Sequence, residues 1–214
     1  MQKGYCGKYF SLLGDSMSTL QGVSQPEGAE FYEGGRKREF GVFAPEDTWW
    51  GQVIDALGGR LLVCDSFSGS TVTRDPLCEY PSYGCSDERT GALHSGETAP
   101  DVIMVLLGAN DRGLRVAVRG GSDWCFEGAY RLMITKLKGL YPLAEIWCMT
   151  IPWAENGYRK TADPYSECIR QVAFEQNCRL LELGDTIYPS PDNLHPNSEG
   201  MRLISSRILE QTER

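Results

Sequence analysis

Short runs of apolar residues recur along the chain, and longer stretches with a helical spacing of apolar positions separate them. The short runs, rich in Val, Ile and Leu, are typical of buried strands, and the longer stretches are typical of amphipathic helices. The predicted strands are Tyr9–Leu13, Arg60–Asp65, Val102–Leu107, Glu145–Ile151 and Arg179–Leu183. The predicted helices are Thr48–Leu57, Trp124–Leu140, Tyr165–Gln176 and Ser198–Gln211. Strands that alternate with helices indicate a parallel sheet with crossover connections. We therefore expect a single α/β domain, residues 1–214, whose central parallel sheet has about five strands, sequential in order and joined by right-handed crossovers.

Two of these helices carry start signals. Asn197 can cap the last helix, and Glu199 in its first turn favours the positive end of the helix dipole. Asp47 or Thr48 can cap the first helix. Local capping chemistry therefore agrees with the boundaries that periodicity predicts.

Three connections are longer than this plan requires: residues 17–47, 70–100 and 152–163. The first and third leave the carboxyl ends of predicted strands, where open α/β sheets bind their ligands. We expect these two to shape a substrate site. The alternative for each is a plain surface insertion.

Charge and hydropathy exclude several classes of protein. The chain has 21 Lys and Arg against 29 Asp and Glu, a net charge of −8, whereas a general nucleic-acid binder carries a basic surface. The longest apolar run, Val102–Leu107, is far shorter than the eighteen or so residues of a membrane span. The N-terminal residues lack the apolar stretch of a signal peptide. We therefore expect a soluble, cytoplasmic protein with no nucleic-acid or membrane partner.

The chain contains eight cysteines, more than is usual for its length. It is nevertheless longer than the small secreted scaffolds that disulfides hold together. Cys64 and Cys148 lie in apolar runs and are predicted to be buried thiols. No pair has the CxxC spacing, and no Cys/His cluster resembles a zinc site. We expect mostly free thiols and no metal site; the strongest alternative is a bond between Cys78 and Cys85.

The first predicted strand runs directly into the segment Gly14-Asp15-Ser16-Met17-Ser18. A serine there lies at the carboxyl edge of the sheet, exposed at a turn. Gly14 allows close backbone approach, and the short polar side chains hold the turn by local hydrogen bonds. Ser16 is thus a candidate nucleophile, the alternative being a polar turn that only ends a strand.

Two more strand ends carry candidate hydrogen-bond donors. Gly69, just after the second strand, can present its backbone N–H to a developing oxyanion with no side chain in the way. Asn110, after the third strand, can direct its amide NH₂ into the same cleft. Each also has a structural alternative, because Gly/Ser and Asn-Asp segments form turns.

A candidate base lies near the C-terminus, where Asp192 precedes His195 by three residues. This offset lets the carboxylate reach Nδ1–H of the imidazole and leaves Nε2 free to accept a serine proton. Pro196 restricts His195 to an extended backbone. The only other histidine, His94, precedes the third strand, at the opposite edge of the sheet, and is interpreted as a structural or surface residue.

Together, these four segments resemble those of the SGNH hydrolases, the GDSL-type esterase and lipase superfamily. GDSMS, Ser68-Gly69, GAND and DNLH match its four blocks in order, over residues 9 to about 210. The resemblance implies a flavodoxin-like three-layer α/β/α sandwich. It also implies Ser16 as nucleophile, His195 as general base and Asp192 as its orienting partner. The oxyanion hole would be formed by the Ser16 and Gly69 N–H groups and the Asn110 side chain. One departure is Asp65, where members of the family often have Asn.

The implied reaction is ester hydrolysis through an acyl-enzyme, which needs no metal or organic cofactor. Its rate should fall as the pH drops below about 6.5, because only neutral imidazole accepts the proton. If Asp192 raises the pKa of His195, the fall moves with that pKa.

The favoured substrate is a small-acyl, acetyl-type ester of a carbohydrate or similar small molecule. Alternatives are a lysophospholipase or arylesterase, a serine acyltransferase with the same catalytic set, and a non-catalytic carbohydrate-binding module. Trp49 and Trp50 are candidate sugar contacts, with helix-to-sheet packing as their alternative. Asp15 and Asp111 are further candidates for substrate contact.

Overall fold

The computed structural model describes residues 4–74, 83–157 and 162–212. Side chains along its central strands point alternately into two apolar layers. In β3 (Val102–Leu106), Met104 packs into one layer, whereas Ile103 and Val105 pack into the other. Every residue of this strand is buried. Burial on both faces explains why the strand has a continuous apolar sequence instead of an alternating one.

The main sheet has five parallel strands in the order β2–β1–β3–β4–β6. Its other members are β1 (Tyr9–Gly14), β2 (Arg60–Ser66), β4 (Glu145–Met149) and β6 (Arg179–Leu181). The predicted parallel sheet is confirmed, but the sequential order is wrong at one edge, where β1 lies between β2 and β3. The connection after β1 covers one face of the sheet, and the connection after β2 covers the other. Because crossovers between parallel strands are right-handed, this change of face reverses the direction in which the next strand is added, so that β3 lies on the other side of β1 from β2.

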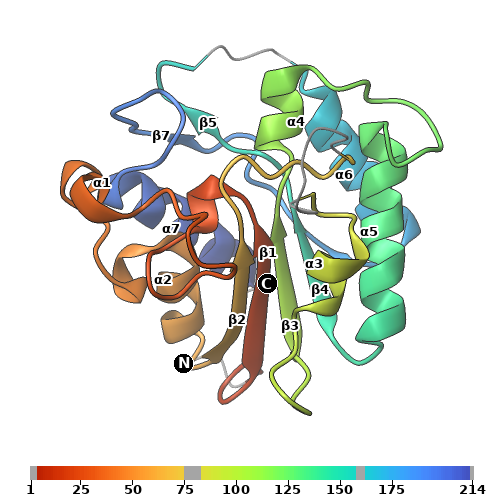
Figure 1. Ribbon diagram of the computed structural model, residues 1–214, viewed down its shortest axis with the longest axis horizontal. Coiled ribbons are helices and arrows are strands. Elements are labelled where there is room, and N and C mark those ends of the chain that lie inside the picture. Colours follow the sequence, from red (N-terminus) through yellow and green to blue (C-terminus); the bar gives the residue numbers. More distant parts are fainter. Residues whose placement is uncertain (1–3, 75–82, 158–161, 213–214) are drawn as a thin grey trace.

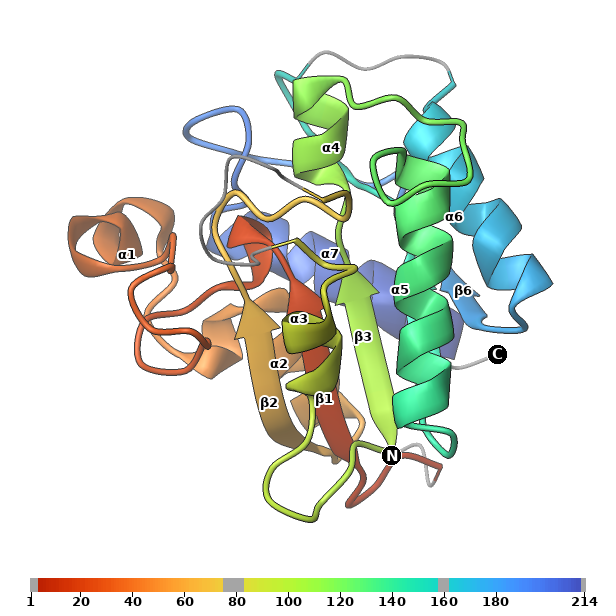
Figure 2. The same ribbon diagram turned by 45° about the vertical axis from the view of Figure 1, so that its right-hand side comes forward.

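Helices cover both faces of the sheet, so the three-layer α/β/α sandwich is confirmed (Figure 1). On one face lie α2 (Trp49–Ala56) and α7 (Ser198–Thr212). On the other lie α5 (Phe126–Leu140) and α6 (Pro164–Glu175), with the short helix α3 (Asp87–Gly91) beside α5 (Figure 2).

The predicted helix caps are present. Thr48 Oγ1 accepts a hydrogen bond from the Gly51 N–H at 3.0 Å, and Asn197 Oδ1 accepts one from the Gly200 N–H at 2.9 Å. Asp47, the alternative cap of α2, accepts instead from two N–H groups of the preceding turn. Side-chain oxygens thus satisfy N–H groups that the first turn of each helix leaves free.

Several short elements have too little sequence pattern to be predicted. They are η1 (Ser16–Ser18), α1 (Gly34–Phe40), η2 (Pro45–Asp47), α4 (Ala109–Leu114), β5 (Trp153–Ala154) and β7 (Ile187–Tyr188). Helix α1 begins with two glycines, and β5 and β7 form a second parallel sheet with only two residues each. None of these elements is long enough to show a hydrophobic period.

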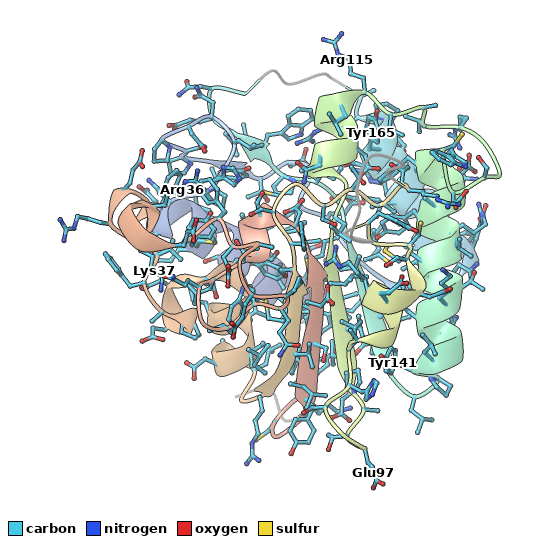
Figure 3. All side chains as sticks on the ribbon, in the orientation of Figure 1. Arg36, Lys37, Glu97, Arg115, Tyr141 and Tyr165 are labelled. Carbon is cyan, nitrogen blue, oxygen red and sulfur yellow. The ribbon has the colours of Figure 1, made fainter. Side chains whose placement is uncertain are left out.

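The carboxyl ends of β1, β2 and β3 point to one edge of the sheet, at the top of Figure 1, toward η1, α4, β5 and β7. The connections 17–47 and 152–163 begin at this edge, as predicted. His94 is exposed in the segment before β3, near Tyr141 at the opposite edge (Figure 3). The candidate catalytic residues therefore share the edge where parallel sheets bind their ligands.

All seven cysteines in the described ranges are free thiols, and Cys64 and Cys148 are buried as expected. Cys85 is buried as well, whereas Cys78, its candidate partner, lies outside the described residues. Within residues 4–74, 83–157 and 162–212, no helix has the length and apolar character that a membrane crossing requires.

Candidate active site

Ser16 opens the turn η1 at the carboxyl end of β1, where it is 6% exposed. Asp15 caps this turn, because its Oδ1 accepts a hydrogen bond from the Met17 N–H at 3.0 Å. Gly14 is required by space: a Cβ at this position would lie within 2.8 Å of two neighbouring serine side chains. The local sequence therefore holds the Ser16 hydroxyl in one place at the end of the sheet.

The turn before α7 brings a histidine and an aspartate to Ser16. His195 Nε2 lies 2.9 Å from Ser16 Oγ, and His195 Nδ1 lies 2.6 Å from Asp192 Oδ2. Asp192 Oδ1 accepts from the N–H groups of Leu194 at 3.0 Å and His195 at 2.8 Å. Asn193 has a φ of 63°, a left-handed conformation that asparagine tolerates in tight turns. With Nδ1–H donated to the carboxylate, Nε2 is placed to accept the proton of the serine hydroxyl.

Phe31, from the connection 17–47, covers the imidazole of His195. The two ring centroids are 3.4 Å apart and the planes differ by 15°. The Arg36 guanidinium lies over the Phe31 ring, 4.7 Å from its centroid, and extends from α1 (Figure 3). This stack shields the imidazole from water and places a positive charge beyond it.

His195 and Asp192, the two titratable residues of the candidate triad, have shifted pKa values. Burial lowers the pKa of His195 below 6.5, and this effect exceeds the opposing hydrogen bond and charge of Asp192; the charge of Arg36 lowers the pKa further. Partial burial alone would raise the pKa of Asp192, but hydrogen bonds from His195 and Leu194 outweigh it and lower the pKa. At neutral pH a neutral imidazole therefore lies beside an ionised carboxylate, as a general base requires.

The acid limb of the pH–activity profile is expected to have its midpoint below pH 6.5. The reason is that burial of His195 lowers its pKa, so the neutral base persists into more acidic solution. The measurement is kcat/KM for p-nitrophenyl acetate across the acidic range, with a buffer series at constant ionic strength. A midpoint above 6.5 would contradict the direction of this shift.

The two candidate oxyanion donors are joined to each other. Gly69 has a φ of 79°, which L side chains rarely adopt, in a turn closed by the Ser70 N–H and the Phe67 carbonyl at 3.1 Å. Asn110, in the first turn of α4, donates from Nδ2 to the Ser70 carbonyl at 2.8 Å. A side-chain amide has two N–H donors. One of them thus anchors Asn110 to the Gly69 turn, and the other remains for a substrate oxygen.

Four residues predicted to contact the substrate, Asp15, Trp49, Trp50 and Asp111, are at most 1% exposed. They have no surface to offer a substrate, so the prediction of direct contact is wrong for the folded chain. Trp49 and Trp50 pack in the core between α2 and the sheet, the alternative considered from sequence. Their indole N–H groups donate to Ser18, at 3.3 Å to Oγ and 2.9 Å to the carbonyl. They therefore support the turn that carries Ser16.

The two aspartates also support the site from inside. Asp111 accepts from the Val72 N–H at 2.7 Å and from the N–H and hydroxyl of Thr73 at 3.1 and 2.8 Å, which ties α4 to the segment after Gly69. Burial raises the pKa of Asp15 to about 7 despite the hydrogen bond from the Met17 N–H. Within the described residues, Asp15 Oδ2 has no hydrogen-bond partner.

Arg89, on α3, is a residue of the site that the sequence pattern did not single out. It is 1% exposed, and its Nε donates to Asp65 Oδ1 at 2.5 Å. Its Nη2 donates to the carbonyls of Gly14 and Asp65, both at 2.9 Å, and its Nη1 donates to the Ser70 hydroxyl. Arg89 thus joins the ends of β1 and β2 to the turn after Gly69. The only sequence signal is Asp65, an acidic residue at a buried strand end, which needs a cationic partner.

Comparisons with known proteins identify the family and the fold. The family model of the GDSL-like lipase/acylhydrolases matches residues 8–212. A candidate GDSL-like lipase from Bacteroides uniformis is 26% identical, with a TM-score of 0.77 over 97% of this chain and 96% of its own. A carbohydrate acetylesterase family member from Sinorhizobium meliloti is 20% identical, with a TM-score of 0.64 over 97% of both chains. An acetyl xylan esterase from Geobacillus stearothermophilus is 21% identical, with a TM-score of 0.62 over 97% of this chain and 95% of its own. No curated protein matches the chain in sequence.

Proposed function

The chain belongs to the GDSL-like lipase/acylhydrolase family and is a carboxylic ester hydrolase, and on that premise we propose that it removes small, acetyl-type acyl groups from a carbohydrate or similar polyhydroxylated small molecule. The observation that carries the proposal is the hydrogen-bonded series from Ser16 through His195 to Asp192, with distances of 2.9 and 2.6 Å. The donors Gly69 and Asn110 lie at the same sheet edge.

In the proposed reaction, Ser16 Oγ attacks the ester carbonyl carbon while His195 Nε2 takes the hydroxyl proton. The carbonyl oxygen becomes an oxyanion that accepts hydrogen bonds from the N–H groups of Ser16 and Gly69 and from the Asn110 amide. His195 then protonates the leaving alcohol, and the C–O bond breaks to give an acyl-enzyme. Water, deprotonated by His195, attacks the acyl carbon, and the proton returns to Ser16 as the carboxylic acid leaves. Asp192 keeps the imidazole in the required tautomer throughout.

Two considerations support a neutral, acetylated carbohydrate as the substrate class. Structural neighbours with nearly complete coverage include a carbohydrate acetylesterase family member and an acetyl xylan esterase. The net charge of −8 disfavours the approach of anionic substrates. The net charge in particular disfavours an anionic phospholipid as substrate.

Acyl selectivity is expected to favour acetyl groups. We expect kcat/KM to fall about tenfold or more from acetyl to octanoyl esters of one alcohol, because each poorly placed methylene loses transition-state binding. The measurement is a series of p-nitrophenyl esters, together with acetate release from acetylated sugars. Preference for the octanoyl ester would contradict the proposal and favour the lysophospholipase alternative. Product analysis with and without a sugar acceptor separates hydrolysis from acyl transfer.

A further inference from the structure

A cavity of about 460 Å³ has direct chain neighbours of Asn110, Asp192 and His195 in its wall. It is lined from α4, β5, β7, the start of α6 and the turn before His195. Ala109 on its wall directly precedes Asn110, and Asn193 and Leu194 lie between Asp192 and His195. A depression of about 510 Å³ on α5 has none of these neighbours on its wall. Of the two, the smaller cavity is therefore the one whose wall is tied by the chain to the candidate catalytic residues.

A fixed ion pair forms one wall of this cavity. The Arg112 guanidinium stacks over the Trp153 ring at 3.7 Å from its centroid. Arg112 Nη1 lies 3.3 Å from Asp163 Oδ2, and Nη2 donates to the Pro152 carbonyl at 3.0 Å. The side chains of Arg112 and Asp163 are only 20% and 9% exposed. These contacts hold the planar guanidinium in one orientation, so it can present its remaining N–H groups to a ligand.

The charges of this wall suit uncharged hydroxyl groups. Asp163 neutralises Arg112; Arg115, at the end of α4, also lines the cavity, but the end of its side chain extends away from the body of the protein (Figure 3). A hydroxyl can accept from the guanidinium and donate to the carboxylate. An alkyl chain can do neither, and it would cover a charged pair without replacing the hydrogen bonds to water.

The remaining walls are mainly apolar and aromatic. Tyr188 donates its hydroxyl to the Leu194 carbonyl at 2.6 Å, and Tyr165 donates its hydroxyl to the Val116 carbonyl at 2.6 Å. With their hydroxyls used in this way, the two mostly buried tyrosines contribute little polar surface to the cavity wall. A pocket of this size that combines aromatic walls with a few fixed polar groups is typical of a small-molecule site.

We propose that this cavity binds the alcohol part of the ester and takes one uncharged, polyhydroxylated ring, such as a neutral monosaccharide unit. The ring would place its C–H surface against the aromatic walls and its hydroxyls toward Arg112 and Asp163. This inference rests on the proposed function, because it assumes that an ester is cleaved at Ser16. It makes Arg112 and Asp163 the residues that determine specificity for the leaving alcohol.

The test uses Gly113, a cavity-lining residue of α4. A Cβ at this position meets no atom within 4 Å, so Gly113→Leu adds a larger apolar side chain at the cavity wall without a clash at its Cβ. We expect KM for an acetylated methyl glycoside to rise at least about tenfold with kcat changed less than about threefold, and KM for ethyl acetate to rise far less, because its two-carbon alcohol has no ring to place in the cavity. Gly139→Leu is the matched control, because Gly139 is also open but lies on α5, outside the cavity.

Product inhibition gives a second measurement that needs no variant. The deacetylated methyl glycoside is expected to compete with ethyl acetate in the wild-type protein, and at least about tenfold less strongly in Gly113→Leu. Equal inhibition in both proteins would overturn the proposal. An increase in KM that depends on acyl length would also overturn it, because the cavity would then hold the acyl part. Failure of the wild-type protein to hydrolyse any ester would instead overturn the proposed function.

Discussion

Replacement of Ser16 by alanine is expected to lower kcat for p-nitrophenyl acetate by about 10⁴- to 10⁶-fold, the scale of loss found when one member of a catalytic triad is removed. The hydroxyl lies 2.9 Å from His195 Nε2, and no other group is proposed to form the acyl-enzyme. His195→Ala should cause a loss of similar size, because residues that act as one unit have non-additive effects. The measurement is steady-state hydrolysis, with circular dichroism to confirm the fold.

Ser18→Ala is the matched control, because Ser18 lies in the same turn and is buried. Its hydroxyl accepts from the Trp49 indole at 3.3 Å and supports the turn, so we expect activity within about tenfold of the wild type. Full activity in the Ser16 variant, or an equal loss in both variants, would contradict the assignment of Ser16 as nucleophile.

Replacement of Arg89 by methionine is expected to have the largest effect on stability, a loss of about 3–5 kcal/mol. The change removes the cation from a buried pair and leaves the Asp65 carboxylate, 6% exposed at its side chain, without that cation. It also removes the hydrogen bond to the Gly14 carbonyl. For a chain of this size, the loss corresponds to a fall in Tm of about 6–20 °C. The measurement is chemical denaturation together with thermal unfolding.

A double variant, Asp65→Leu with Arg89→Met, separates the ion pair from simple packing. Removal of both charges leaves no buried charge uncompensated, so the double variant should recover part of the stability that the single variant loses. A single variant that loses less than about 1 kcal/mol would contradict the proposed role of Arg89. A double variant that loses as much stability as the Asp65→Leu and Arg89→Met single variants together would also contradict this role.

The sheet could be predicted because its strands are buried on both faces. The run Val102–Leu107 is apolar without interruption, and the observed strand β3 covers all but its last residue. The strand order could not be predicted in the same way. The position of β1 between β2 and β3 depends on which face each connection covers, and the hydrophobic pattern does not record that choice.

The candidate triad could be predicted because its residues occur where parallel strands end or directly before the last helix. The residues that support it could not, because tertiary contacts define them. Phe31 lies in a long connection and contacts His195 only after the chain folds. Arg89 lies in a helix too short to show a period. Trp49 and Trp50 show the opposite error: their proximity to the site suggested substrate contact, but they are buried in the core.

Covalent labelling shows directly whether Ser16 forms the acyl-enzyme. The protein is mixed with p-nitrophenyl acetate at low pH, where protonation of His195 slows deacylation, quenched in acid, and analysed by intact and peptide mass spectrometry. We expect one acetyl group per chain, attached to Ser16, and none in the Ser16→Ala variant. An acetyl group on another residue, or turnover without any acetyl group on Ser16, would contradict this role of Ser16.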